Sequence, residues 1–261
     1  MYKALNDFFE LLFPPKCICC GAFLPRRKGD AALCPSCLKE WEKEKSTGRC
    51  RTCGQFYPLC GCDARRITNP SEKSVFLVGY DLSVEVPARL ILMNKTSNRS
   101  SVSSFLAKEL AIRISGSDLP KTDVCISYCP RNPINKRLAG YDQAKVLAEK
   151  VGKILKIPCL NLIGHASLSK VQKTLDKEER KKNAARSYAL RPSAKGDLSG
   201  KAVILIDDIS TTGSTLDRCA ALLRKAGAGR IFYAYIARSN FRDSYDRPTA
   251  ESEEKRKAEN R

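Results

Sequence analysis

The segment from Val203 to Thr215 combines two adjacent acids with a run of hydroxyl residues around a glycine. The acids Asp207 and Asp208 follow an apolar run, and after them come Thr211, Thr212, Gly213, Ser214 and Thr215. Hydroxyls donate hydrogen bonds to oxyanions, glycine lets the backbone approach closely, and the amino end of a following helix adds free amides and a positive dipole. The pattern predicts a cradle for a monophosphate.

The acid pair is expected to face the sugar of the same ligand. Vicinal ribose hydroxyls are donors that carboxylates accept, and a carboxylate pair also suits Mg²⁺, directly or through water. A P-loop is excluded because the chain has no Gly-Lys-Ser/Thr, and Gly-x-Gly-x-x-Gly is absent as well. The alternative is a plain helix cap, which needs one capping residue and leaves both acids and four hydroxyls unexplained.

Nine of the thirteen cysteines lie between Cys17 and Cys62, mostly in pairs. Two thiolates on one tight turn and two on another complete a tetrahedral zinc site. Two structural zinc ribbons are therefore predicted, with the ligands Cys17, Cys20, Cys34 and Cys37 in the first and Cys50, Cys53, Cys60 and Cys62 in the second. Cys19 is a spare thiol in the first turn. Three alternatives remain. The ligands of one zinc ion could come from both ribbons, the chain could hold one zinc ion in place of two, or the cysteines could be disulfides or free thiols.

The chain is strongly basic. Lys and Arg number 47 against 28 Asp and Glu, which gives a net charge of +19 and a pI near 9.5. Such an excess favours a polyanion partner, since cations that neutralise phosphates release counterions. A basic surface that serves small phosphorylated ligands is the alternative. Zinc would hold part of this charge as a platform: Arg26, Arg27, Lys28, Arg49, Arg51, Arg65 and Arg66.

The elements that must position the acids and hydroxyls alternate between strands and helices. Strands are predicted over 74–80, 124–128, 202–206 and 230–236, and helices over 103–114, 141–155 and 216–226. The run 202–206 is apolar throughout, as in a central parallel strand covered on both faces. We therefore expect an α/β fold with a mainly parallel sheet flanked by helices, whose ligands bind beyond the carboxyl ends of the strands.

Composition divides the chain into three regions. Residues 1–66 are predicted to form the double zinc ribbon, 74–239 the α/β domain, and 240–261 a disordered charged tail. No apolar run reaches the roughly 20 residues that a membrane-spanning helix needs. The apolar patch near the amino terminus is interrupted by acids and lacks a cleavage site, so we expect a cytoplasmic protein without a signal peptide.

Two single residues are further candidates. His165 is the only histidine and follows Gly164 in an expected loop, where a packed or surface role is favoured over a catalytic base. Trp41, the only tryptophan, could stack on a base, but packing against the ribbon is favoured. No nucleophile and no base-recognition element is identified, so catalytic residues stay unknown.

The segment Val203–Thr215 resembles the signature of type I phosphoribosyltransferases, whose usual ligand is phosphoribosyl pyrophosphate with Mg²⁺. The whole chain resembles the ComF family, in which zinc ribbons precede such a domain. Further matching segments run along the chain: Leu90–Lys95, Lys136–Gln143, Gln172–Leu175 with Glu179, Arg180 and Asn183, Ala226–Ala228, and Ala237–Arg238.

The resemblance implies roles for individual residues. Asp207 and Asp208 would hold the ribose, residues 211–215 the 5′-phosphate, and Lys95 would lie near the pyrophosphate. The chain departs from the family at two places: Ala139 stands where the family has Arg, and Tyr141-Asp142 where it has Phe-Asn. The first change removes a cation from a loop that could close over the site.

Two functions follow from the resemblance. The first is a binding protein in the cytoplasmic handling of single-stranded DNA during natural transformation, whose pocket grips single-stranded DNA or a nucleotide, with a competence helicase as candidate partner. The second is an active phosphoribosyltransferase that uses phosphoribosyl pyrophosphate and Mg²⁺ on a base or an amine. The charge and the ribbons favour the first, while the intact acid pair favours the second, so turnover is left open.

Overall fold

The computed structural model describes residues 13–24, 32–47, 73–80, 84–117, 122–165, 188–192, 198–211 and 213–239. The elements in chain order are α2 (Pro35–Thr47), β1 (Lys73–Tyr80), α3 (Glu85–Thr96), α4 (Ser100–Ser115), β2 (Val124–Tyr128), α5 (Pro133–Ala139), α6 (Gln143–Leu155), β3 (Ile163–His165), β4 (Tyr188–Leu190), β5 (Ala202–Ser210), α8 (Ser214–Lys225) and β6 (Ile231–Ser239). The predicted tail 240–261, the second group of paired cysteines and the matching segment 172–183 lie outside the described residues.

Four strands form a parallel sheet in the order β1-β6-β5-β2. β5 lies inside this sheet, and its side chains alternate between the two faces. Ile204 and Ile206 belong to one hydrophobic core, while Val203 and Leu205 belong to the other. The prediction of a central parallel strand covered on both faces is confirmed.

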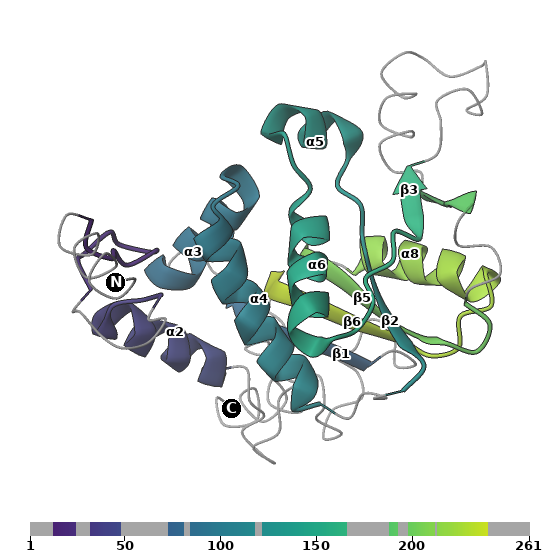
Figure 1. Cartoon of the computed structure of the whole chain (residues 1–261), viewed down its shortest axis with the longest axis horizontal. Helices are drawn as coiled ribbons and strands as arrows, with labels where there is room; N and C mark the ends of the chain where they lie inside the picture. Colours follow the sequence, from purple (N-terminus) through teal and green to yellow (C-terminus); the bar gives the residue numbers. More distant parts are fainter. Residues whose placement is uncertain are drawn as a thin grey trace, which may run out of the picture.

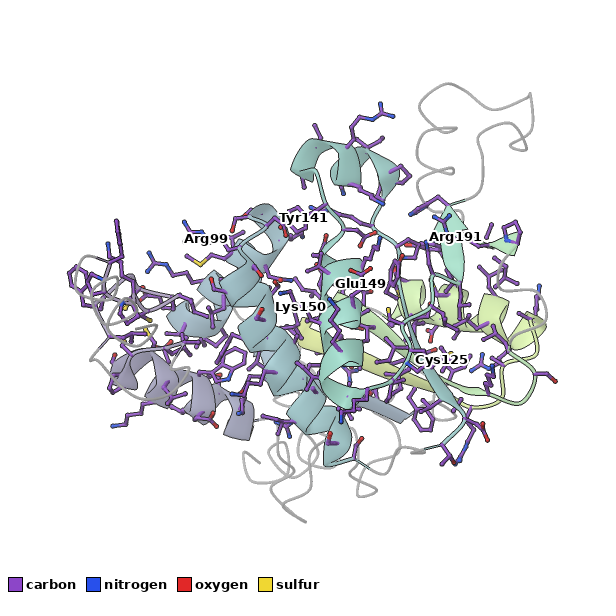
Figure 2. The ribbon with its side chains drawn as sticks, viewed as in Figure 1. Arg99, Cys125, Tyr141, Glu149, Lys150 and Arg191 are labelled. Atoms are coloured by element: carbon purple, nitrogen blue, oxygen red, sulfur yellow. The ribbon has the colours of Figure 1, made fainter. Side chains whose placement is uncertain are left out.

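Helices cover both faces of the sheet (Figure 1). α3, α4 and α6 pack on one face, where Leu106 and Leu147 are fully buried. α8 packs on the other face together with the antiparallel pair of strands β3 and β4. α6 is also tied to α4 by Lys150, whose Nζ donates to the Oγ atoms of Ser100 at 3.0 Å and Ser104 at 2.7 Å (Figure 2). The predicted α/β fold is therefore confirmed.

The described elements differ from the prediction mainly around β5 and at three helices. β5 continues to Ser210 instead of ending at Ile206, because its pairing with β6 extends as far as Ser210 opposite Arg238. Asp207 and Asp208 are therefore strand residues and not the start of a loop. The helices α2, α3 and α5 and the short strands β3 and β4 add to the predicted set.

α2 packs directly on the α/β region. Trp41 is fully buried, its ring centroid lies 5.4 Å from that of Phe105, and its Nε1 donates to Glu109 Oε2 at 3.0 Å. Lys45 Nζ contacts the same carboxylate oxygen at 2.6 Å. The packing interpretation of Trp41 is confirmed, although its partner is α4 and not the ribbon, and the buried ring cannot stack on a base.

The helices in the described part of the chain are each too short or too polar to cross a membrane.

Candidate functional site

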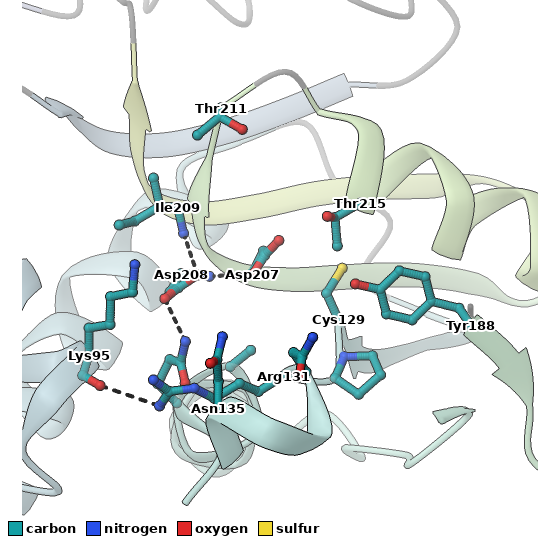
Figure 3. Close-up of a pocket in the computed structure, with 14 residues that line it drawn as sticks. Lys95, Cys129, Arg131, Asn135, Tyr188, Asp207, Asp208, Ile209, Thr211 and Thr215 are labelled. Carbon is teal, nitrogen blue, oxygen red and sulfur yellow. Dashed lines mark hydrogen bonds between the residues drawn. The ribbon is translucent and has the colours of Figure 1, made fainter. Parts of the chain in front are cut away.

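A cavity of about 440 Å³ lies at the carboxyl ends of β2 and β5, beside the amino end of α8 (Figure 3). Five residues that the sequence predicts for ligand binding line it: Lys95, Asp207, Asp208, Thr211 and Thr215. These residues come from α3, β5, the following turn and α8, so the fold brings separate segments to one place. The other lining residues are Cys129, Pro130, Arg131, Asn132, Asn135, Gln143, Ala144, Tyr188 and Ile209.

The turn between β5 and α8 forms one end of this cavity. Gly213 has a φ of +76°, in the left-handed region that favours glycine, and Ser214 begins the helix. Gly213 has no side chain that could cap α8, and the amino end of this helix, with its positive dipole, lies beside Thr211 and Thr215, which line the cavity. Thr212, predicted as part of the same cradle, lies outside the described residues.

The two acids lie side by side on β5 (Figure 3). Asp207 is 9% exposed, and its Oδ1 accepts from the backbone N–H of Asp208 at 2.8 Å. Asp208 Oδ1 accepts from the N–H of Ile209 at 2.7 Å, and its Oδ2 accepts from Gln143 Nε2 at 2.7 Å. Burial raises the pKa of Asp207 well above its usual value, and the adjacent charge of Asp208 acts in the same direction. Hydroxyl donors or a divalent cation would relieve this unfavourable pair.

The loop between β2 and α6 connects Lys95 with the acids. Tyr141 Oη donates to the carbonyl oxygen of Asn94 at 2.7 Å, and Arg131 Nη1 donates to the carbonyl oxygen of Lys95 at 3.3 Å. The Arg131 guanidinium also lies 5.7 Å from the centre of the Tyr141 ring, and Asp142 Oδ2 accepts from the Arg131 N–H at 3.0 Å. The departure Tyr141-Asp142 therefore has a structural role. Tyr141 contacts the end of α3 that carries Lys95, and Asp142 holds the backbone of Arg131, whose side chain contacts the same end.

The wall opposite Lys95 carries Cys129 and Tyr188 (Figure 3). Burial raises the pKa of Tyr188 to about 12 and that of Cys129 well above its usual value, so both groups are uncharged at neutral pH. The Tyr188 hydroxyl is thus a neutral hydrogen-bonding group beside Thr215. Cys129 is buried, as a small core residue would be, and it also lines the cavity.

His165 supports this wall from behind. Its Nε2 lies 3.1 Å from the carbonyl oxygen of Arg131 and 3.2 Å from that of Pro130, so it donates to these carbonyls. Its ring centroid lies 4.9 Å from that of Tyr188. These contacts agree with the packed role and give no support to a catalytic base.

Gln143 and Tyr188 are the main cavity residues that sequence reasoning missed. Gln143 lies in the matching segment Lys136–Gln143, so the resemblance offered a signal for it. Tyr188 stands in a three-residue strand after a long connection, and its local sequence has no comparable signal.

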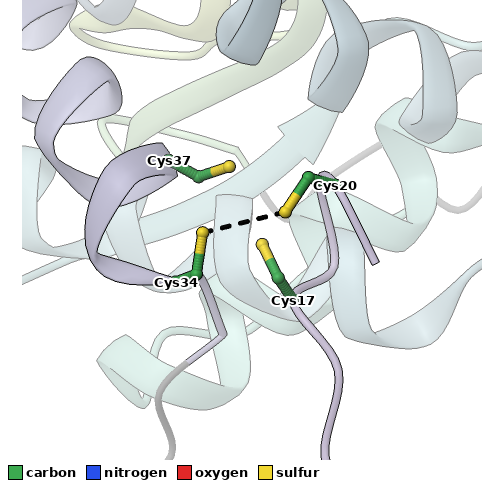
Figure 4. A group of neighbouring side chains, drawn as sticks. All are labelled: Cys17, Cys20, Cys34 and Cys37. Carbon is green, nitrogen blue, oxygen red and sulfur yellow. Dashed lines mark hydrogen bonds between the residues drawn. The ribbon is translucent and has the colours of Figure 1, made fainter. Parts of the chain in front are cut away.

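The first two cysteine pairs come together in the structure (Figure 4). The Sγ atoms of Cys17, Cys20, Cys34 and Cys37 all lie within 4.8 Å of one another, and those of Cys20 and Cys34 are 3.7 Å apart. Four thiolates around one zinc ion at about 2.3 Å would be about 3.8 Å apart. The cluster is therefore compatible with zinc. Cys19 is buried outside this group, whereas Cys50, Cys53, Cys60 and Cys62 lie outside the described residues.

Comparisons with known proteins agree with this arrangement. Residues 142–256 match the profile of the phosphoribosyl transferase domain. The chain is 28% identical over 240 residues to Competence protein F of Haemophilus influenzae, a match that covers 90% of this chain and all of the relative. It is 24% identical over 232 residues to DNA utilization protein YhgH of Escherichia coli, which covers 85% of this chain and 96% of that protein. The predicted resemblance to the ComF family and the type I phosphoribosyltransferase fold are thereby confirmed.

Proposed function

Because the chain is a ComF-like protein with a phosphoribosyl transferase domain, we propose that its cavity binds a ribosyl 5-phosphate with Mg²⁺, and first of all phosphoribosyl pyrophosphate. The observation that carries this proposal is the meeting of the acid pair, two threonines and Lys95 in one cavity of about 440 Å³. Asp207 and Asp208 would accept from the ribose hydroxyls, and residues 211–215 would hold the 5′-phosphate. Lys95 would lie near the pyrophosphate, whose charge Mg²⁺ would help to neutralise.

The biological role that we propose is the handling of single-stranded DNA in the cytoplasm during natural transformation. Two observations support it: the net charge of +19, and the relatives named for competence and DNA utilization. A basic protein of this kind should bind DNA with an affinity that falls steeply as salt is raised, because phosphate contacts release counterions.

Transfer of the phosphoribosyl group is the second candidate. The specific observation in its favour is the buried acid pair, which suits ribose hydroxyls and Mg²⁺ and has little use in a simple contact with DNA phosphates. In that reaction a base or an amine would form the new bond to the ribosyl carbon, and pyrophosphate would leave.

The experiment that tests the cavity is calorimetry with phosphoribosyl pyrophosphate, with and without Mg²⁺. The variant Asp207→Asn/Asp208→Asn should lose at least tenfold in affinity. The control Asp123→Asn removes an exposed acid at the opposite end of β2, where asparagine tolerates the φ of +50°, and should bind like the wild type. Equal binding by all three proteins would contradict the proposal, and release of pyrophosphate with a base or amine would favour the second candidate.

A further inference from the structure

The acid pair limits which ligands fit the cavity. Asp207 and Asp208 are acceptors, and a sugar with two free hydroxyls satisfies them. An internal DNA nucleotide lacks the 2′-hydroxyl, and its 3′-oxygen is esterified to phosphate. Such a nucleotide would therefore bring a negative charge, and no donor, to a carboxylate whose pKa burial already raises. A DNA strand fits this cavity poorly, so its binding surface should lie elsewhere.

Helix α5 borders the cavity and yet buries none of its residues. Asn132 caps it by accepting from the Ile134 N–H at 2.9 Å, and Gly140 ends it at a φ of +77°. A seven-residue helix is not stable alone in water, so these caps and the neighbouring loops must hold it in place. Figure 1 shows α5 projecting from the end of the molecule above α6, and Figure 2 shows that some of its side chains are directed away from the sheet, whereas Asn135 faces the cavity.

The exposed side chains of α5 combine positive charge with apolar surface. Ile134 is 51% exposed and Leu138 is 82% exposed, and with Arg137 they lie within about 100° of arc around the helix. Lys136 is also exposed, and within the described part of the chain neither it nor Arg137 pairs with an acid. Phosphates bind such cations, and the unstacked bases of a single strand offer faces to aliphatic side chains.

We propose that α5 is the surface that holds single-stranded DNA, beside the cavity and not inside it. This inference rests on the proposed role in DNA handling and adds its location. It follows that DNA and phosphoribosyl pyrophosphate bind to the same molecule at the same time. A strand inside the cavity would instead compete with that ligand.

The test uses the full chain and a fluorescent oligothymidylate of roughly 20 nucleotides, somewhat longer than the usual contact length of one binding domain. The variant Lys136→Ala/Arg137→Ala should bind DNA about tenfold more weakly at low salt. The slope of its affinity against salt should fall by about 1.4, as expected for two lost phosphate contacts. Calorimetry with phosphoribosyl pyrophosphate should give the wild-type affinity, since neither residue lines the cavity.

Matched control variants show whether DNA binding depends on the position of the cations on α5 or only on the total positive charge of the protein. Lys108→Ala/Lys153→Ala removes two exposed lysines from α4 and α6 and should weaken DNA binding less than twofold. Ile134→Ser/Leu138→Ser should weaken binding without changing the salt slope, whereas Ile154→Ser at an exposed position of α6 should not. All of these are surface changes, so the thermal midpoints should agree with that of the wild type.

The outcomes distinguish this inference from the proposed role. Failure of the wild type to bind the oligonucleotide would refute the role in DNA handling. Wild-type binding that the α5 variants retain in full would overturn the inference alone and leave α5 for a protein partner. Displacement of the oligonucleotide by phosphoribosyl pyrophosphate would overturn it too, because the strand would then lie in the cavity.

Discussion

The cysteine cluster and the acid pair both hold titratable groups close together, but they differ in what surrounds those groups. Four thiols within 4.8 Å of one another can satisfy a zinc ion completely, which leaves no position open for a ligand. The two acids lie on the wall of a cavity, and burial disfavours the charge of Asp207. The cysteine cluster, whose thiols would all be used by one metal ion, therefore stabilises the fold. The acid pair, which faces a cavity, lowers the stability of the ligand-free protein and serves a bound molecule.

One helix joins the two regions. Glu40 of α2 accepts from the backbone N–H of Val86 at 2.9 Å, in the first turn of α3. The last turn of α3 carries Lys95, which lines the cavity, and Asn94, whose carbonyl oxygen accepts from the Tyr141 hydroxyl. The cysteine-rich segment is thus connected to the ligand site through α3.

The largest effect should come from the metal. Zinc binding contributes about 10–16 kcal/mol to the folding of small zinc peptides, so Cys17→Ser should lose one zinc ion per chain and disorder the turn before α2. The measurements are zinc content after dialysis and the emission of Trp41, which should shift to longer wavelength as α2 detaches.

Cys19→Ser is the matched control, because Cys19 is buried beside the cluster but is not one of its four members. Its zinc content should equal that of the wild type. If both variants kept their zinc, or both lost it, the assignment of Cys17, Cys20, Cys34 and Cys37 as the four zinc ligands would be wrong.

The contact of α2 with α4 should give the next largest effect. Trp41→Ala removes a fully buried ring and leaves Glu109 without one donor, so unfolding in denaturant should require about 3–5 kcal/mol less. Leu38→Ala on the same helix removes a side chain that is 43% exposed and should cost much less. Similar losses in the two variants would show that α2 does not dock as described.

A change in the acid pair should raise the stability of the ligand-free protein, whereas the changes described above lower it. Asp207→Asn keeps an acceptor for the Asp208 N–H but removes a buried charge, so the ligand-free variant should gain about 0.5–2 kcal/mol in stability while it loses affinity for the ligand. The pKa of Asp207 is raised on folding from 3.8, and its ionisation therefore lowers wild-type stability as the pH rises through the folded pKa. The advantage of the variant should thus grow as the pH rises from about 4 and then level off.

Unfolding curves of the wild type and the variant at several pH values measure this difference. A variant that is less stable than the wild type at every pH would mean that the acid pair supports the fold, and the contrast between the two regions would disappear.

The smallest effect should come from the link between the regions. Glu40→Ala removes the carboxylate that caps α3 and should lower stability by about 1 kcal/mol. Glu42→Ala, which breaks only a partly exposed pair with Lys45, should cost less than about 0.5 kcal/mol. Thermal unfolding of both variants measures the two losses of stability. Equal losses would show that the hydrogen bond from Val86 to Glu40 does not connect α2 with α3.

Local patterns in the sequence were sufficient for the main elements. The strand 124–128 was predicted with the bounds that the structure gives, because it is an apolar run that ends before Pro130. The segment 203–215 was placed correctly between a buried strand and a helix, since its acids, hydroxyls and glycine are adjacent in the chain.

Contacts between distant segments could not be predicted in this way. Trp41 and Glu109 are 68 positions apart, and Gln143 reaches Asp208 across 65 positions, so no local pattern indicates either bond. Whether a buried indole faces a ribbon or a helix depends on how these segments pack. The extension of β5 through both acids was missed for the same reason, because it depends on the pairing with β6.

The most direct test of the account compares ribose 5-phosphate with 2-deoxyribose 5-phosphate in the presence of Mg²⁺. The two ligands differ by one hydroxyl, which would donate to the acid pair. We expect the deoxy sugar to bind at least tenfold more weakly, since a lost hydrogen bond to a charged group costs about 1.5–3 kcal/mol. Equal affinities would contradict the claim that Asp207 and Asp208 hold the ribose.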